Sequence, residues 1–177
     1  MLKIWIAASA ALAVAGCARD RAADEDVAPV AARPSSVAAE LRDASGAVRA
    51  RASVTQEGED LRVRIEAVNM TPGAYGTHIH AVGRCDPPDF ASAGPHWNPS
   101  GRQHGKENPE GLHKGDLPNL LVGADGKGSI EYPVRGAAMG ALLDEDGAAV
   151  IVHAQADDYR TDPSGNSGAR MSCGVLR

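Results

Sequence analysis

Residues 76–116 read GTHIHAVGRCDPPDFASAGPHWNPSGRQHGKENPEGLHKGD, and this segment is unusual in its histidines. It holds five of the six in the chain, namely His78, His80, His96, His104 and His113. The sixth, His153, lies downstream in the apolar run AAVIVHAQADD. Histidine is the commonest metal ligand, and metal sites combine it with carboxylates. The concentration of imidazole in one Gly- and Pro-rich segment therefore predicts a metal site.

The spacing of these residues refines the prediction. His78 and His80 stand two apart in a strand-like run, so both side chains point to one face, roughly 6–7 Å apart, while Ile79 points to the core. His96, His104 and His113 follow in an irregular segment, with Asp116 three residues further on. Three imidazoles and one carboxylate suit the tetrahedral geometry of zinc. Taken singly, an HxH pair is more often a polar face, and His153 more often a hydrogen-bonded core residue.

The rest of the chain predicts an all-β fold. Apolar residues alternate with Arg, Ser and Glu over 48–54 and 61–67, and the polar turn EGED joins the two runs into a hairpin. Further strands are predicted near 75–82, 120–123, 128–134, 148–155 and 172–176, with turns at 125–126 and 146–147. No convincing helix is present. Several short strands in one domain indicate an antiparallel β-sandwich or β-barrel, and a net charge of −5 with no basic stripe speaks against nucleic-acid binding.

The N-terminal residues predict export. Lys3 precedes an apolar run over 4–15 that is too short to span a bilayer, and the run ends in Val14-Ala15-Gly16-Cys17. We interpret residues 1–17 as a signal peptide with a lipobox and Cys17 as the lipidation site; an ordinary secretory signal peptide is the alternative. Residues 18–36 are Ala- and Pro-rich and predict a flexible tether, which leaves 37–177 as the folded domain.

The motifs resemble those of a bacterial copper/zinc superoxide dismutase from about Val37 to Leu176. GTHIHAVG is similar to the family's copper-binding strand, SAGPHWNP to the segment with the metal-bridging histidine, and HKGDLPNL to the end of the zinc loop. VHAQADD and GNSGARMSCGVL resemble the last copper strand and the C-terminal signature. The resemblance implies a Greek-key antiparallel β-barrel or sandwich with long metal-binding loops.

The resemblance also assigns residues. It implies copper on His78, His80, His96 and His153, and zinc on His96, His104, His113 and Asp116, with His96 shared. It implies that Asp157, rather than its neighbour Asp158, accepts hydrogen bonds from one copper and one zinc histidine, as ligating imidazoles require. Arg170 matches the arginine that guides the anion, and Cys85 and Cys173 match the family's disulfide, which export makes chemically reasonable.

The activity implied is the conversion of superoxide to dioxygen and hydrogen peroxide. Copper would be reduced and reoxidised in turn, zinc would be structural, and the bridging His96 would carry a proton. Export and the lipid anchor add a periplasmic, membrane-bound location that protects the cell envelope. Two alternatives remain open: a metal carrier with the same ligands, and a structural domain that binds partners. Trp97 fits either a core residue or a subunit contact, so a homodimer is left open, as are steering residues other than Arg170.

Overall fold

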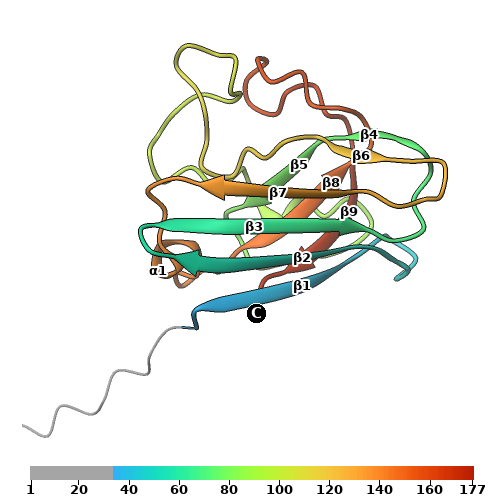
Figure 1. The fold of residues 1–177 in the computed structure, drawn as a ribbon, viewed down its shortest axis with the longest axis horizontal. Helices are drawn as coiled ribbons and strands as arrows, with labels where there is room; N and C mark the ends of the chain where they lie inside the picture. Colours follow the sequence, from blue (N-terminus) through green and yellow to red (C-terminus); the bar gives the residue numbers. More distant parts are fainter. Residues whose placement is uncertain (1–33) are drawn as a thin grey trace, which may run out of the picture. The chain divides into compact units, whose positions relative to one another are not determined.

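The computed structural model describes residues 34–177, and within them the chain is built almost wholly from strands (Figure 1). The strands are β1 Ser36–Arg42, β2 Val48–Glu57, β3 Asp60–Ala67, β4 Gly73–Tyr75, β5 Thr77–His80, β6 Leu120–Val122, β7 Ser129–Val134, β8 Ala149–His153 and β9 Arg170–Val175. Two single turns of helix, η1 Ala91–Ala93 and α1 Met139–Leu142, lie in the connections.

Seven of these strands form one antiparallel sheet in the order β5-β8-β9-β1-β2-β3-β7, and β4 pairs with β6 in a second, small sheet. The sheet curls on itself, with β5, β8 and β9 behind β1, β2, β3 and β7 (Figure 1). The pairs β3–β7 and β5–β8 join strands that are not consecutive, which is the crossover pattern of a Greek key. The predicted all-β sandwich or barrel is therefore confirmed.

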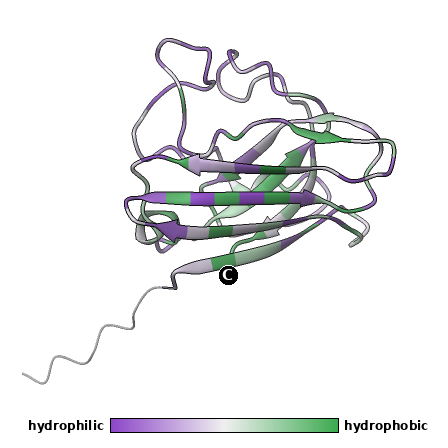
Figure 2. Cartoon of the chain, viewed as in Figure 1, coloured by the Kyte–Doolittle hydropathy of each residue, from purple (hydrophilic) through white to green (hydrophobic). Residues whose placement is uncertain are grey.

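Alternation of side chains explains why these residues form a two-faced sheet. Along β3 the apolar residues Leu61, Val63 and Ile65 are fully buried, whereas Arg62, Arg64 and Glu66 stand on the outer face. Figure 2 shows this alternation of hydrophobic and hydrophilic residues along β3. Burying one such face against the opposite half of the curled sheet removes apolar surface from water, which is the main favourable term in folding. The core therefore lies inside the curl.

Most predicted strands and both turns are present, with three differences. β1 was not predicted as a strand. The run predicted over 75–82 is two strands, β4 and β5, which belong to different sheets and are separated by Gly76. The prediction found no helix, whereas α1 is one turn that buries Met139 and Leu142. The signal peptide, Cys17 and nearly all of the tether lie outside the described residues, and no helix within 34–177 is long and apolar enough to cross a membrane.

Candidate metal centre

The strand β5 sets the position of the first two histidines. His78 and His80 point to one face of the strand, with ring centroids 6.4 Å apart, and Ile79 between them is fully buried in the core. β5 pairs with β8, which ends at His153, and the rings of His78 and His153 approach to 4.8 Å between centroids. Two adjacent strands thus bring together histidines that lie about seventy residues apart in sequence.

The outer edge of β5 recruits the loop residues. Ile79 donates its amide to Gly115 O and accepts from the Trp97 amide, both at 2.8 Å, so two loop segments pair with this edge. Two isolated antiparallel β-bridges place His96 opposite His80 and Asp116 opposite His78. Gly115 is required at this approach, because a Cβ there would lie 2.3 Å from Ile79 O. Backbone pairing at the strand edge therefore delivers His96 and Asp116 to the site.

A first cluster consists of the four histidines His78, His80, His96 and His153, all buried, with donor atoms within 4.8 Å of one another. Four buried ring nitrogens within 34–177 have no hydrogen-bond partner, and they belong to these four residues: His78 Nδ1, His80 Nε2, His96 Nε2 and His153 Nε2. A buried polar atom without a partner costs free energy. One metal ion bound by all four nitrogens would satisfy them together, so the donor set fits copper, for which imidazole is a suitable ligand.

In three of the four rings, the other nitrogen is fixed by a hydrogen bond. His80 Nδ1 is 2.8 Å from Gly94 O, His153 Nδ1 is 3.1 Å from Gly168 O, and His78 Nε2 is 2.7 Å from Asp157 Oδ2. Metal-binding histidines almost always donate their second N–H in this way, which orients the ring and leaves one nitrogen free for the ion. The unpartnered nitrogens of His78, His80 and His153 are thus positioned by these hydrogen bonds.

A second cluster surrounds Asp116. Its Oδ1 atom lies 3.0 Å from His96 Nδ1, 3.0 Å from His104 Nδ1 and 3.1 Å from His113 Nδ1. The Oδ2 atom accepts the amides of Gly105 and His113. Three imidazole nitrogens around one carboxylate oxygen are the donors of a tetrahedral zinc site. His96 belongs to both clusters, with Nδ1 in this one and Nε2 in the first.

Distance alone also groups His78 with His96, His104 and Asp116, because one donor from each lies within 4.8 Å of the others. We assign His113 rather than His78 to the second cluster. His78 Nε2 is bonded to Asp157 and its Nδ1 is one of the four unpartnered nitrogens, whereas His113 Nδ1 contacts Asp116 directly.

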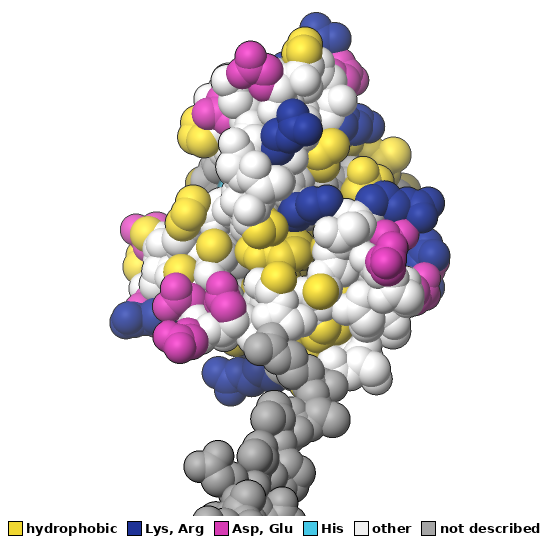
Figure 3. All heavy atoms as spheres, turned by 90° about the vertical axis from the view of Figure 1, so that its left-hand side faces the viewer, with side chains coloured by type: hydrophobic (Ala, Val, Ile, Leu, Met, Phe, Trp, Pro, Cys, Tyr) yellow, Lys and Arg dark blue, Asp and Glu magenta, His cyan; other side chains and the backbone are white. Residues whose placement is uncertain are grey.

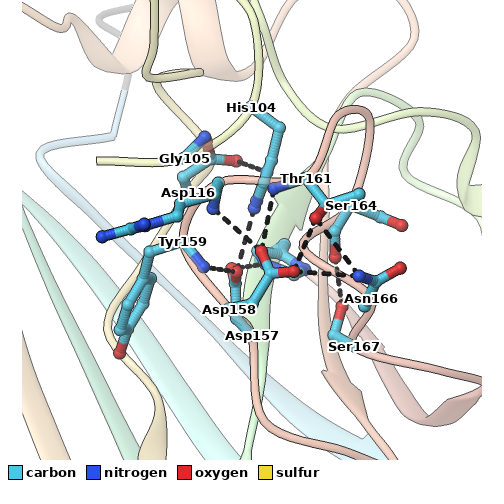
Figure 4. Close-up of polar contacts among 12 residues, drawn as sticks. His104, Gly105, Asp116, Asp157, Asp158, Tyr159, Thr161, Ser164, Asn166 and Ser167 are labelled. Carbon is cyan, nitrogen blue, oxygen red and sulfur yellow. Dashed lines mark hydrogen bonds and ion pairs between the residues drawn. The ribbon is translucent and has the colours of Figure 1, made fainter. Parts of the chain in front are cut away.

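Asp157 connects the two clusters. Its Oδ2 atom accepts from His78 at 2.7 Å, and its Oδ1 atom is 3.0 Å from His104 Nε2. The neighbouring Asp158 instead turns away, and its carboxylate accepts from Thr161 and Asn166 within its own loop (Figure 4). The structure therefore gives Asp157, and not Asp158, a place between a histidine of each cluster.

Burial and hydrogen bonding lower the pKa values of several histidines and of Asp116. Burial lowers the pKa of His78 to about 3, of His80 to about 2 and of His153 to about 4. These imidazoles are neutral at pH 7, which is the form that binds metal. Burial raises the pKa of the Asp116 carboxyl, but hydrogen bonds with His104, His113 and His96 outweigh it and keep the pKa far below its usual range. Asp116 is therefore an anion ready to bind a cation.

A cavity of about 1170 Å³ opens above the first cluster, and its lining includes His80, His96, His113, His153 and Arg170. The Arg170 guanidinium donates to Phe90 O and Gly94 O, each at 2.7 Å. Asp89, Asp144 and Asp162 line the same cavity, and on the face viewed in Figure 3 basic and acidic side chains are mixed. A fixed cation thus stands beside the histidines in a cavity that also contains carboxylates.

The predicted disulfide between Cys85 and Cys173 is confirmed, with a Cα–Cα distance of 5.7 Å. Cys173 lies on β9, and Cys85 lies in the loop after β5 that also contains Phe90 and Gly94. Because the carbonyls of those two residues hold Arg170, the disulfide fastens to the sheet the loop that positions the arginine.

Sequence reasoning missed three residues near the site. Arg102 lines the cavity and has no ion pair within the described part of the chain, whereas Lys106 lies over the Tyr159 ring and Lys114 donates to Arg135 O. Asn119 and Tyr159 hold Asp157 in place. Asn119 lies in the quoted segment HKGDLPNL, but nothing in that segment links it to Asp157, which lies 38 residues further along the chain. Arg102 and Tyr159 are of common types and lie in none of the quoted motifs.

Comparison with known proteins identifies the family. The family model for copper/zinc superoxide dismutase (SODC) matches residues 44–176. A superoxide dismutase-like protein of Bacillus subtilis is 52% identical over 126 residues, which cover 68% of this chain and 64% of that protein, slightly under two thirds of its length. A Cu-Zn superoxide dismutase of Aquifex aeolicus is 38% identical over 147 residues, covering 78% of this chain and 86% of the relative.

Solved structures agree with the fold. The SOD-like protein from Bacillus subtilis superposes with a TM-score of 0.74 at 42% identity, covering 82% of this chain and 100% of that one. The Cu/Zn superoxide dismutase from Brucella abortus gives a TM-score of 0.65 at 28% identity, covering 80% of this chain and 99% of that one. With two overlapping histidine clusters, a bridging carboxylate and a matching family model on the same residues, the chain belongs to the copper/zinc superoxide dismutase family.

Proposed function

We propose that this chain is a superoxide dismutase that holds copper in the first cluster and zinc in the second. The observation that supports this most directly is the set of four buried, unpartnered nitrogens on His78, His80, His96 and His153. Three of these residues, His80, His96 and His153, line the same cavity as Arg170. A copper ion there would alternate between two oxidation states and so exchange one electron with each of two superoxide ions. Zinc has no redox chemistry and would fix the loops around Asp116.

The residues of the chain supply binding and protons. Arg170 remains charged at all relevant pH values, and its planar fork of N–H donors suits docking of a small anion in the cavity. His96 lines the cavity, and its Nε2 atom, when not bound to a metal ion, would hold a proton and pass it to the substrate. Asp157 contacts His78 Nε2 and His104 Nε2 and would keep these two imidazoles in the orientation and tautomer needed for metal binding, whereas Asp116 would supply a carboxylate oxygen to the zinc itself.

A metal carrier that does not consume superoxide is the competing function. One relative is named only superoxide dismutase-like, and a solved double mutant of the Bacillus subtilis SOD-like protein carries two introduced histidines. In this chain all six histidines lie in the two clusters without engineering. A carrier would also have no use for a cation beside the copper histidines, so Arg170 favours dismutation.

The test is a metal analysis combined with a dismutation assay on the full chain. We expect one copper and one zinc per chain and rapid removal of superoxide. Removing copper with a chelator should abolish the activity, and adding copper back, but not zinc, should restore it. His153→Ala should lose copper and activity but retain zinc, because His153 belongs only to the first cluster. Stable copper binding without superoxide removal would instead establish a carrier.

We also propose that the protein is exported to the periplasm, is attached to a membrane through lipid on Cys17, and protects the cell envelope from superoxide. The run Val14-Ala15-Gly16-Cys17 after a short apolar segment supports this proposal.

A homodimer stays a prediction. Trp97 is 5% exposed and packs in the core, and Leu121 is the one large hydrophobic side chain exposed within residues 34–177.

A further inference from the structure

The carboxylate of Asp157 is useful to the metal centre only if it stays where both His78 and His104 reach it. It lies in the segment between β8 and β9, outside any strand. Within the described residues, two residues that make no hydrogen bond to any of the six histidines are hydrogen-bonded to Asp157: Asn119 and Tyr159. These contacts are partly buried and bond both the main chain and the carboxylate of Asp157.

Asn119 holds the main chain of Asp157. Its Nδ2 atom donates to Asp157 O at 2.9 Å, and its Oδ1 atom accepts the Asp157 amide at 2.8 Å. A side-chain amide that makes both bonds to one residue fixes that residue much as a neighbouring strand would. Asn119 immediately precedes β6, so the clamp connects Asp157 to the small β4–β6 sheet.

Tyr159 holds the carboxylate itself. Its backbone amide donates to Asp157 Oδ1 at 2.6 Å, and its hydroxyl accepts a hydrogen bond from the backbone amide of Asn119 at 2.8 Å (Figure 4 shows Tyr159 beside Asp157). The backbone of Tyr159 has φ 62°, a left-handed conformation that is costly for a bulky residue. Such a conformation persists only where surrounding contacts impose it, and here it aims the amide at Asp157.

The segment 105–107, which follows His104, packs against the same tyrosine. Lys106 Nζ lies 3.9 Å from the centroid of the Tyr159 ring, and Glu107 donates its amide to Tyr159 O at 3.0 Å. Gly105 passes so close that a Cβ would lie 2.1 Å from Tyr159 O. The ring and main chain of Tyr159 are therefore packed against the loop that begins at His104.

The bonds at Asp157 are divided between the clusters by oxygen atom. Oδ1 accepts from the Tyr159 amide and lies 3.0 Å from His104 Nε2, whereas Oδ2 lies 2.7 Å from His78 Nε2. Tyr159 thus anchors the oxygen that faces the second cluster. Loosening Tyr159 should disturb His104 more than His78.

From this arrangement we infer that Tyr159 and Asn119 are positioning residues that hold Asp157 against His104 and thereby slow the loss of zinc. The inference deepens the proposed function and rests on its assignment of zinc to the second cluster. Groups that bond a metal-binding histidine directly typically contribute about 10- to 100-fold in metal affinity. Tyr159 acts one bond further out, so its contribution should be smaller, roughly 3- to 10-fold.

The experiment compares Tyr159→Phe with Tyr75→Phe in the full chain loaded with copper and zinc. The control also loses one hydroxyl hydrogen bond, from Tyr75 to Thr71 O at 2.7 Å, but Tyr75 contacts neither cluster. Zinc release to a chromophoric chelator is followed at fixed pH. Tyr159→Phe should release zinc about 3- to 10-fold faster than wild type, Tyr75→Phe should release it at the wild-type rate, and copper release should change little in either. Cobalt placed in the second cluster should show an altered visible spectrum in Tyr159→Phe alone.

A second comparison separates positioning from general loosening. In an Asp157→Ala background, Tyr159→Phe should add little to zinc release, because the group through which it acts is gone. Asn119→Ala should behave like Tyr159→Phe in both backgrounds. Equal acceleration with and without Asp157, or zinc release from Tyr159→Phe at the wild-type rate, would overturn the inference while leaving the proposed function intact. A wild-type chain that binds no zinc would refute the metal assignment itself.

Discussion

At the scale of single residues, Arg170 shares its cavity with carboxylates that repel an anionic substrate. Asp89, Asp144 and Asp162 line its cavity, Arg102 and Arg170 are the arginines of the lining, and the chain has a net charge of −5. A superoxide anion is therefore attracted only close to the arginines. Clefts focus the field of such charges and raise association rates by about 10- to 1000-fold.

We predict that Arg170→Ala slows dismutation by about 10-fold or more and weakens inhibition by small anions, at unchanged copper and zinc content. Arg170→Glu should be slower still, and added salt should raise its rate because the repulsion is screened. The control is Arg51→Ala, which removes the same charge from β2, outside the cavity. Full activity and full anion sensitivity in Arg170→Ala would refute the guiding role and favour a metal carrier.

A second prediction concerns Asp116 and Asp157, the two carboxylates of the site, neither of which is a donor of the first cluster. Asp116→Ala removes the carboxylate that we assign to zinc, and Asp157→Ala removes the group that contacts His104 and His78 but leaves all four nitrogens of the first cluster in place. Both should weaken zinc binding more than copper binding, by about 10- to 100-fold for Asp157 and more for Asp116. Titration of each metal into the metal-free variants measures the difference. Equal loss of both metals in Asp116→Ala, or unchanged zinc affinity in both variants, would contradict the assignment.

The sequence supports prediction of the metal-binding residues better than of the residues around them. Histidine is rare and chemically distinctive, so His78, His96 and His113 stand out by type and order. Asn119 bonds Asp157 and Tyr159 across 38 and 40 residues of sequence, and Tyr159 bonds Asp157 through its main-chain amide, which any residue type except proline would offer. Contacts of that kind become visible only when the chain is folded.

At the scale of strands and loops, alternation predicts what a strand is but not where it pairs. β3 follows its period-2 pattern over its full length, and β2 follows it from Ala50 to Val54. β1 buries chiefly Val37 and Leu41, and its remaining residues are small or polar, so its pattern is weak. The predicted strand over 75–82 is interrupted at Gly76, where the later loop passes very close to the backbone. A Cβ at this position would lie 2.7 Å from Ser167 Cβ, so only glycine allows this approach.

The disulfide tests how a loop controls the cavity. Replacing both Cys85 and Cys173 by Ser should lower the free energy of unfolding by about 2–5 kcal/mol. It should also reduce dismutation and anion inhibition, since the loop whose Phe90 and Gly94 carbonyls hold Arg170 is released. Urea unfolding, metal content and activity are measured together.

The matched control is Ile65→Ala, which creates a cavity in β3 at a comparable cost of about 2–5 kcal/mol but does not touch the loop. It should retain activity and anion inhibition under folding conditions. If the double Ser variant, fully metal-loaded and folded, matched Ile65→Ala in activity and anion inhibition, the disulfide would be a stabilising element alone.

At the scale of the whole molecule, periodicity limits the fold to an antiparallel barrel or sandwich but leaves the strand order undetermined. The pairs β3–β7 and β5–β8 join segments separated by long loops, and no local pattern specifies them. The order of the motifs along the chain supplied the missing topology through resemblance to the family. The site depends on that order, because β5 and β8 become neighbours only through it.

The last prediction concerns the location of the whole protein and rests on Cys17, outside the described residues. If Cys17 is lipidated, each buried CH₂ of its acyl chain adds roughly 0.8 kcal/mol of membrane binding, so the wild-type protein should fractionate with membranes and incorporate labelled fatty acid. Cys17→Ser should lose the label and leave the membrane fraction, while dismutation per copper ion stays at the wild-type level, because residues 37–177 are unchanged. Cys85→Ser is the control for cysteine replacement and should keep the label. A wild-type chain without lipid on Cys17 would exclude the anchor and favour an ordinary cleaved signal peptide.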